Sequence, residues 1–268
     1  MIFVMSTLLI GYTPPVAQGA SVVITDAVQL VDGGAVNERM ASMTSDSDGN
    51  IHVVWSRNTQ HLYYTMLDPR AQTVIDVTQI SNGGGHRAWH PDIDIDSEDR
   101  VHVTWANKAS QHEILYTLLD PSLDDQDGGP ADDSTISIID DTEVTRRQQN
   151  RDWPAIAVDS QDNAHIVWED SFDRHDKYFQ QPQIYYKFLE IDEASREAIT
   201  AIDSTLLTPI IGHKGHPDIA IDADDLVQIA WDDTRGGKVE IVSVIDTSGS
   251  MYSEWADMCV VFYGGQWS

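Results

Sequence analysis

Histidine recurs at one position of a short apolar segment that the chain repeats. The copies are His52, His102 and His165, and the fourth copy has Gln228 instead. Neutral imidazole is a common metal ligand, so several such side chains arranged in a circle would suggest a metal site. A polar residue in every copy also has a simpler role, which is to hydrogen-bond the neighbouring copy each time. We favour the simpler role.

Basic side chains precede another apolar segment of each repeat. They are Arg39, Arg87, Arg151 and Lys214. Gathered at one mouth of an otherwise acidic protein, these cations would bind a carboxylate or sulfate ligand. Each of them could equally pair with a local carboxylate such as Asp152 or Asp218. The four are therefore the predicted ligand-binding residues, with local ion pairing as the alternative.

Three carboxylates alternate along one segment, at Asp92, Asp94 and Asp96. Alternate residues of a strand share a face. Three like charges there repel one another unless water or a cation such as Ca²⁺ surrounds them. Calcium binding is therefore an alternative to simple solvation.

The hexapeptide Asp-Thr-Ser-Gly-Ser-Met, residues 246–251, follows the apolar run Val239–Ile245. This arrangement resembles the opening of a von Willebrand factor A domain. The resemblance implies a Mg²⁺ site with Asp246, Ser248 and Ser250 as ligands. Mg²⁺ takes such hard oxygen ligands and would keep an open position for an acidic group of a partner.

Only 17 residues follow Met251, whereas an A-type domain needs roughly 150 or more. An apolar tail without a partner would also favour aggregation. We therefore expect a fragment in which residues 247–268 begin an α/β A-type module. The alternative is an ordinary turn at residues 246–251, like Asp68-Pro69 and Asp120-Pro121.

Recognisable catalytic motifs are missing from the sequence. It contains no Gly-x-Ser-x-Gly, no His-Glu-x-x-His and no phosphate-binding glycine loop followed by lysine. Neighbouring carboxylates such as Glu169 and Asp170 point to opposite faces of a strand, which makes them weak candidates for shared acid–base catalysis. The sequence alone therefore predicts a protein that is not an enzyme.

The histidines and the alternating carboxylates belong to a fourfold internal repeat, and the basic residues lie beside the same repeated segments. Equivalent segments end in Trp55, Trp105, Trp168 and Trp231. Each unit holds short alternating runs rich in β-branched and aromatic residues, which predict strands, joined by links with turn residues. Four antiparallel strands in each repeat of about 40–60 residues indicate a β-propeller blade. The predicted fold is all-β, with residues 21–246 forming blades at about 37–80, 88–140, 152–207 and 214–246.

The number of blades in the ring stays open. Residues 22–30 resemble the fourth strand of a blade, and the fourth repeat has no evident fourth strand of its own. These residues could close a four-bladed ring and protect its sheet edges. The chain could equally be part of a larger ring, and its open edges would then let copies of it associate.

The repeats resemble those of secreted and surface propellers of the sialidase and NHL types, over about residues 37–246. The shared pattern is Pro-x-Ile-x-x-Asp-x-x-Gly-Asn-x-x-Val-x-Trp. An intact sialidase Asp-box is not present, because Trp55 lies six residues after Gly49 where that box has three.

Charge and the N-terminus limit the partners and the location. Sixteen Lys and Arg against 44 Asp and Glu give a net charge of −28, which repels nucleic acid and anionic membranes and also aids solubility. Cys259 is the only cysteine, so no internal disulfide framework and no cysteine-rich zinc site can form. Residues 1–20 are typical of a secretory signal, and Ile2–Ile10 is too short to cross a membrane. We expect a secreted or cell-surface protein.

Two classes of function follow. The main hypothesis is an adhesion protein that binds a protein or glycan ligand through Mg²⁺, on a propeller scaffold. The alternative is a sialidase-like or lectin-like propeller that processes or binds glycans, with Arg39, Arg87 and Arg151 lining the mouth.

Overall fold

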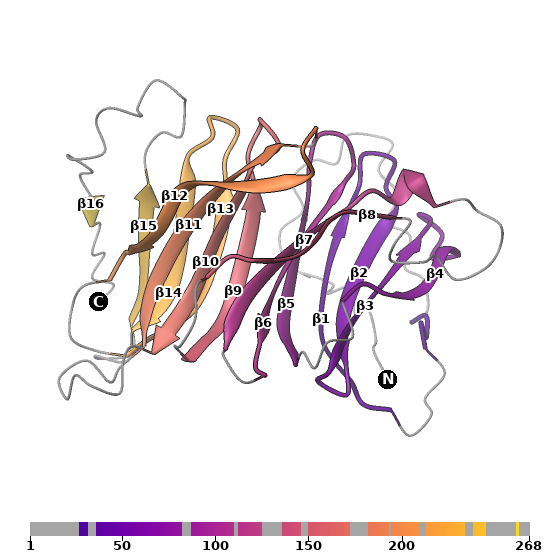
Figure 1. Cartoon of the computed structure of the whole chain (residues 1–268), viewed down its shortest axis with the longest axis horizontal. Coiled ribbons are helices and arrows are strands. Elements are labelled where there is room, and N and C mark those ends of the chain that lie inside the picture. Colours follow the sequence, from indigo (N-terminus) through magenta and orange to yellow (C-terminus); the bar gives the residue numbers. More distant parts are fainter. Residues whose placement is uncertain are drawn as a thin grey trace, which may run out of the picture.

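The structure is a computed structural model in which four antiparallel sheets follow one another along the chain (Figure 1). It describes residues 27–31, 36–81, 87–109, 112–124, 136–145, 150–171, 182–192, 194–208, 213–233, 238–244 and 261–262. In this part of the chain, no helix is long and apolar enough to cross a membrane.

Each sheet has four strands in simple up-and-down order. The first contains β1 (Glu38–Ser45), β2 (Ile51–Arg57), β3 (His61–Leu67) and β4 (Thr73–Gln79). The second contains β5 (Ala88–Ile95), β6 (Val101–Asn107), β7 (Glu113–Leu119) and β8 (Ser137–Glu143), with the short helix η1 (Pro121–Leu123) before β8. The third contains β9 (Asn150–Val158), β10 (Ala164–Ser171), β11 (Gln183–Asp192) and β12 (Glu197–Leu206). The fourth contains β13 (Lys214–Ile221), β14 (Val227–Asp233), β15 (Lys238–Val244) and β16 (Val261–Phe262). The prediction of an all-β chain with four-stranded antiparallel units is confirmed.

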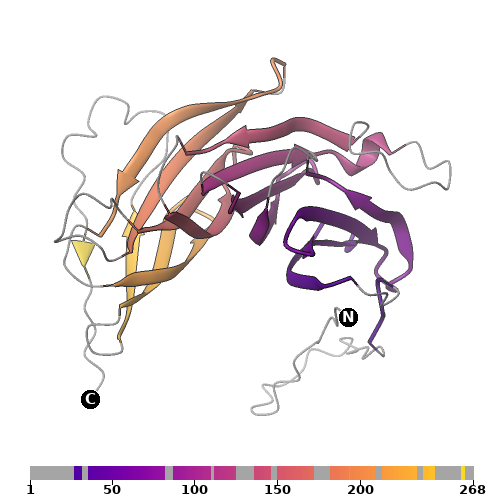
Figure 2. The same cartoon turned by 60° about the horizontal axis from the view of Figure 1, so that its bottom comes forward.

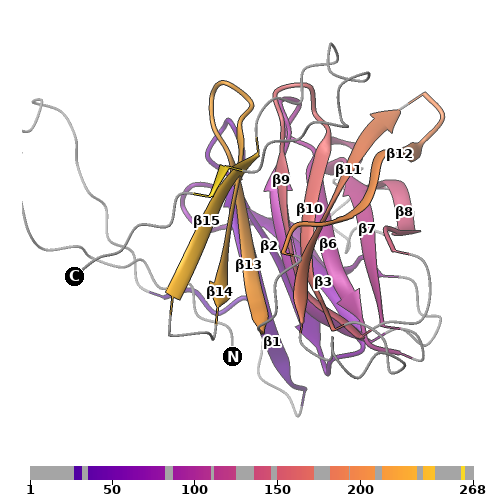
Figure 3. The ribbon, with the colours of Figure 1, turned by 90° about the vertical axis from the view of Figure 1, so that its left-hand side faces the viewer.

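The sheets pack side by side as the blades of an arc (Figures 2 and 3). The first strand of each sheet lies innermost, and β1, β5, β9 and β13 contact one another in that order. No extensive contact joins the first sheet to the fourth within the described ranges. In the described part of the chain, the blades thus form an arc that is open between β1 and β13.

The last sheet obtains its fourth strand from the C-terminal side of the chain. In β16, Val261 and Phe262 lie opposite Ser243 and Val242 of β15, in antiparallel register. In the described part of the chain, this place is thus taken by β16 and not by residues 22–30, which could have closed the blade. Residues 27–31 form no strand, and residues 22–26 lie outside the described part. A two-residue strand has too little alternation to be recognised from sequence.

The predicted A-type module is not supported. The chain after β15 returns to pair antiparallel with β15 itself, which continues the order of the blade. Asp246, Ser248 and Ser250 lie outside the described residues. Among the residues that are described, none forms an A-type α/β unit.

Three apolar clusters fill the three junctions between successive blades. The second strand of each blade alternates, so that residues such as Val103 and Trp105 pack on the blade before it, while Ala106 packs on the blade after it. The repeated Trp105, Trp168 and Trp231 are at most 1% exposed. These tryptophans are therefore core residues of the junctions.

A second link joins the blades at the turns between their first and second strands. Ser97 donates from its backbone N and its Oγ to the Asp162 carboxylate of the next blade, at 2.8 and 3.0 Å. The same two bonds join Ser47 to Asp99 and Ser160 to Asp225. The acceptor aspartates have left-handed backbones, with φ between 57° and 64°.

In each link, the serine of one blade donates to the aspartate of the next blade. The first blade lacks the acceptor, and the fourth blade lacks the donor. Gly49, with φ of 81°, takes the place of the acceptor in the first blade, and Ala223 takes the place of the donor in the fourth. We expect Ser97→Ala to lower the free energy of unfolding by about 0.5–1.5 kcal/mol, because one hydrogen bond to a carboxylate is lost. Urea denaturation measures this change.

The matched control is Ala223→Ser, which installs the donor where no acceptor aspartate faces it in the described blades. It should leave the urea midpoint unchanged. Equal effects of the two substitutions would contradict a linking role for Ser97.

Candidate functional site

The inner strands share an unusual backbone position close to their first residues. In each, the register with the second strand shifts at a bulge. One residue there has a left-handed backbone: Met40 (φ 54°), His90 (46°), Trp153 (49°) and His216 (49°). Such conformations cost roughly 1–3 kcal/mol in residues other than glycine and cluster at functional sites. This row of bulge residues therefore marks the candidate site.

The bulge residues contact one another across the blades. The His90 and Trp153 rings stack with their centroids 3.6 Å apart, and His216 meets Trp153 edge-on at 4.5 Å. Trp153 is 37% exposed, unlike the buried tryptophans of the junctions. An exposed indole held by its neighbours is a rigid apolar surface on which a ligand ring can stack.

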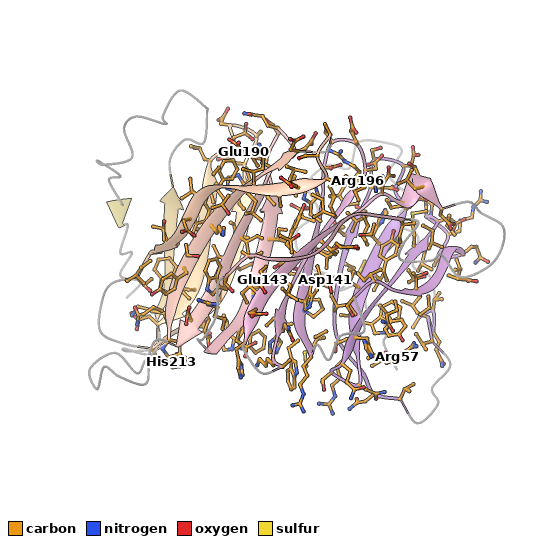
Figure 4. All side chains as sticks on the ribbon, viewed as in Figure 1. Arg57, Asp141, Glu143, Glu190, Arg196 and His213 are labelled. Carbon is orange, nitrogen blue, oxygen red and sulfur yellow. The ribbon has the colours of Figure 1, made fainter. Side chains whose placement is uncertain are left out.

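The row lies at one end of the sheets. His213, just before β13, and Arg57, the last residue of β2, are both at the lower end in Figure 4, whereas Glu190 and Arg196 are at the upper end. The turns with the Ser–Asp links occupy the other end of the inner strands. The candidate site and these links are thus separated by the length of a strand.

Asp152 is the first carboxylate of the site. It accepts hydrogen bonds from His90 Nδ1, at 2.7 Å, and from Lys108 Nζ. Its side chain is 16% exposed. Burial alone would raise the pKa of Asp152, but the hydrogen bonds from His90 and Lys108 outweigh it and hold the pKa below its usual value. Asp152 is therefore ionised at neutral pH.

Glu169 is the second carboxylate, and it lies directly opposite Asp152 in the register of β9 and β10. Burial raises the pKa of Glu169, and the nearby charge of Asp152 raises it further. Two neighbouring carboxyl groups whose pKa values are pushed apart suit the roles of a proton donor and an ionised partner. The site thus combines an acid–base pair with an exposed tryptophan.

This pair cannot be found by comparing carboxylates that are adjacent along the chain. Asp170, the neighbour of Glu169, is buried and bound to Arg151. The true partner of Glu169 lies across the strands. Aligning the repeats by strand register places Asp152 and Glu169 opposite each other, as it does Trp89 and Ala106 in the second blade.

The four predicted basic residues do not gather at the mouth. Arg151 and Lys214 are buried in ion pairs with Asp170 and Asp233, at 2.9 and 2.8 Å. These pairs occupy the register position that Glu38 and Arg57 hold with opposite signs in the first blade. Arg151 and Lys214 both stand two residues before the bulge residue of their strand, whereas Arg39 stands one residue before. A shift of one residue turns a side chain to the other face of a strand.

Arg39 and Arg87, the other two, are exposed. The Arg39 Nε donates to Asn37 Oδ1 at 2.8 Å. The backbone N of Arg87 donates to Asn107 Oδ1 at 3.0 Å. The carboxylates that were expected to pair with the basic residues have other partners, since Asp152 binds His90 and Lys108.

The repeated histidines are buried between two partners of their own blade. His52 Nε2 lies 3.2 Å from Asp46 Oδ2, and its Nδ1 lies 2.9 Å from the Tyr64 hydroxyl. The same pattern joins His102 to Asp96 and Tyr116, and His165 to Asp159 and Tyr186. The hydrogen-bonding role is present, but the expected partner in the neighbouring blade is replaced by partners within the blade.

This network is complete with a neutral ring. Nε2–H donates to the ionised Asp46, and the Tyr64 hydroxyl donates to Nδ1. A protonated His52 would have no lone pair for Tyr64. Burial accordingly lowers the pKa of His52.

The lowered pKa makes stability depend on pH. Below the ordinary histidine pKa of about 6.5, the unfolded chain binds a proton at His52 that the folded chain takes up only at lower pH. The free energy of unfolding should therefore fall as the pH drops below about 6.5, by at most about 1.4 kcal/mol per pH unit for this group. Urea denaturation at several values from pH 7.5 to 5.5 measures the slope.

The control for this slope is His52→Gln, which copies Gln228 of the fourth blade. It should be less stable at pH 7.5 but lose less stability on acidification. A slope as steep as that of the wild type would assign the effect to other groups.

The three alternating carboxylates have protein partners. Asp92 accepts from Ser42 Oγ and from the backbone N of Ile156, and Asp94 accepts from the backbone N of Val158. The Asp96 carboxylate binds Arg100 and His102. No group of three or more His, Cys, Asp or Glu side chains in the described ranges could hold a metal ion. Calcium binding stays a prediction, to which these contacts lend no support.

The comparisons with known proteins agree with a propeller. No protein-family model matches the chain, and no curated protein matches it. Among solved structures, it is similar to a thermostable family-43 glycoside hydrolase, with a TM-score of 0.52 and 11% identity over 87% of this chain and 74% of that one. It is also similar to an endo-arabinase from Bacteroides thetaiotaomicron, with a TM-score of 0.50 and 12% identity over 84% and 79% of the two chains.

A third similar structure is the α-L-arabinofuranosidase from Lactobacillus brevis, with a TM-score of 0.50 and 12% identity over 80% of this chain and 69% of that one. These likenesses define the class of fold, which is a β-propeller. They give no support to repeats of the sialidase or NHL type. The prediction that the chain is not an enzyme is corrected, because the similar solved structures are glycoside hydrolases.

Proposed function

We propose that this chain is a glycan-processing propeller that hydrolyses glycosidic bonds at the row of bulge residues. The observation that carries the proposal is the Asp152–Glu169 pair, with its pKa values shifted in opposite directions, beside the exposed Trp153. The glycoside hydrolases of similar fold support it. The glycan-processing alternative thus replaces adhesion as the main hypothesis.

The two carboxyl groups have different roles in this proposal. Protonated Glu169 donates its proton to the glycosidic oxygen as the bond to the anomeric carbon breaks. Ionised Asp152 stabilises the positive charge that develops on the sugar ring, and a water molecule adds a hydroxyl group to the anomeric carbon while its other proton returns to the Glu169 carboxylate. His90 and Lys108 keep Asp152 charged for this purpose.

The substrate class follows from charge. A protein with a net charge of −28 repels sulfated and uronate-rich polymers. The exposed face of Trp153 favours stacking against the apolar face of an uncharged sugar. We therefore propose a neutral glycan, such as an arabinan, a xylan or a galactan.

The test is a reducing-sugar assay with arabinan, xylan, galactan and a sulfated galactan, at several pH values and with EDTA present. We expect hydrolysis of at least one neutral polymer and none of the sulfated one. Trp153→Ala should raise KM about tenfold or more, because a stacking surface is lost. Absence of hydrolysis of every neutral polymer, together with absence of binding in affinity electrophoresis, would overturn the proposal.

The Mg²⁺ site at Asp246, Ser248 and Ser250 is a separate proposal that rests on the sequence alone. Calorimetric titration with Mg²⁺ tests it, using wild type and Asp246→Ala. Binding that is the same in both would eliminate these ligands. Secretion likewise stays a prediction from residues 1–20.

A further inference from the structure

The space for the Glu169 side chain depends on the fourth blade. A β-carbon added at Gly215 would lie 2.8 Å from Glu169 Oε2 and 3.2 Å from His213 Cε1. Contacts below 3.0 Å are not accommodated without movement of one partner. Here the partner is the carboxylate that the proposed reaction uses.

The other blades treat the same two positions differently. The second-strand residue equivalent to Glu169 is Ser56 in the first blade and Ala106 in the second. The residue equivalent to Gly215 in the following blade is Trp89 across from Ser56 and Asp152 across from Ala106. At these two junctions, a small second-strand residue therefore faces a larger inner-strand residue. At the third junction, the large residue Glu169 faces glycine instead.

The backbone next to Gly215 also contacts the carboxylate. The backbone amide of His216, the bulge residue that follows, lies close enough to Glu169 to favour its ionised form, which opposes the effect of burial on the pKa of Glu169. Asp232, directly opposite Gly215, is drawn away toward His216 Nδ1, at 2.9 Å. The start of β13 thus forms a slot for the Glu169 carboxyl group. Its sides are His213, Gly215 and the backbone amide of His216.

We propose that Gly215 is a positioning residue, whose missing side chain lets the fourth blade hold the Glu169 carboxyl group in place at the candidate site. Its catalytic meaning rests on the proposed function. A methyl group there would force the carboxylate away from the His216 amide and change its position relative to Asp152. The slot itself is a physical claim that can be tested without any substrate.

The structural test is a set of double-mutant cycles in thermal unfolding. Gly215→Ala should lower Tm by only about 2–4 °C in the wild type, because the contact is with the flexible end of Glu169, which can move aside at a cost of about 1 kcal/mol. In the Glu169→Gln background, which keeps the volume of the side chain, the loss should be as large. In the Glu169→Ala background, which copies the small residue of the second blade, the loss should vanish. If Gly215→Ala lowered Tm equally in all three backgrounds, the proposal would be overturned. The loss would then come from the backbone of residue 215 and not from contact with Glu169.

The functional test uses the same variants with the best substrate. Gly215→Ala should lower kcat at least tenfold with little change in KM, and it should move the alkaline limb of the pH–rate profile, which Glu169 controls. A purely structural glycine would lower the amount of folded enzyme but leave that limb unmoved. If the wild type hydrolyses no glycan, the proposed function fails, while the unfolding cycles still decide whether the slot exists.

Discussion

Glu169→Gln should lower kcat on a hydrolysed glycan by about 10²–10⁴-fold, which is the usual contribution of a general acid. The glutamine amide has the volume of the carboxyl group but cannot donate the required proton to the leaving oxygen. Folding should be unchanged, since the side chain lies at the edge of the core. Initial rates and the thermal unfolding curve of the same sample measure both effects.

The activity should fall at both low and high pH, because each carboxyl group must be in one protonation state. Activity should fall on the acid side as Asp152 becomes protonated, below its ordinary carboxyl range. It should fall on the alkaline side as Glu169 loses its proton, above the ordinary range of a glutamate. The Gln variant should lose the alkaline limb from its residual rate.

The control is Glu143→Gln, an exposed residue on β8, which is the outermost strand of its blade and is separated from the inner strand β5 by β6 and β7. It makes the same Glu-to-Gln exchange and should keep wild-type kcat. If both variants lost activity equally, a general effect of the exchange rather than the loss of a proton donor would be responsible. If Glu169→Gln retained full activity, Glu169 would not be the acid.

Trp168→Ala should lower the free energy of unfolding by about 3–5 kcal/mol, the largest effect on stability that we expect. Trp168 is completely buried in the cluster between the second and third blades, where it packs with residues such as Ile156 and Ile166. Removal of the indole loses its transfer free energy and leaves a cavity that rigid strands cannot fill. Urea denaturation followed by circular dichroism measures the loss.

Trp153→Ala is the matched control for this prediction. Trp153 belongs to the same blade but is 37% exposed, so its removal should cost far less stability. It should instead weaken glycan binding. A reversal of these two outcomes would mean that the junction tryptophans bind ligand and Trp153 forms the core.

The repeat made the propeller predictable, and residue spacing alone placed whole blades closely. The blade predicted at about 88–140 corresponds to β5 to β8, which run from Ala88 to Glu143. Strong alternation and turn residues at fixed offsets explain this success. The strand at Val261–Phe262 could not be found, because two residues carry no period.

The site was far less predictable, because it depends on contacts between blades. The bulges that turn His90 and Trp153 toward each other require backbones with positive φ in residues other than glycine, which no sequence pattern indicates. The assignment of Arg151 and Lys214 to the mouth failed through one-residue offsets that exchange the two faces of a strand. Strand register, rather than residue type, decides which side chains meet.

The Ser–Asp links also bear on how such a chain can change its length by recombination. A copy of the second or third repeat would bring both Ser and Asp, as in Ser97 with Asp99, so an inserted blade could bond to both neighbours. A copy of the first repeat would bring Gly49, and a copy of the fourth would bring Ala223, so each would create a junction with one bonding half missing. Gene duplication within the middle of the array is therefore favoured over duplication at its ends, and two residues are enough to impose that bias.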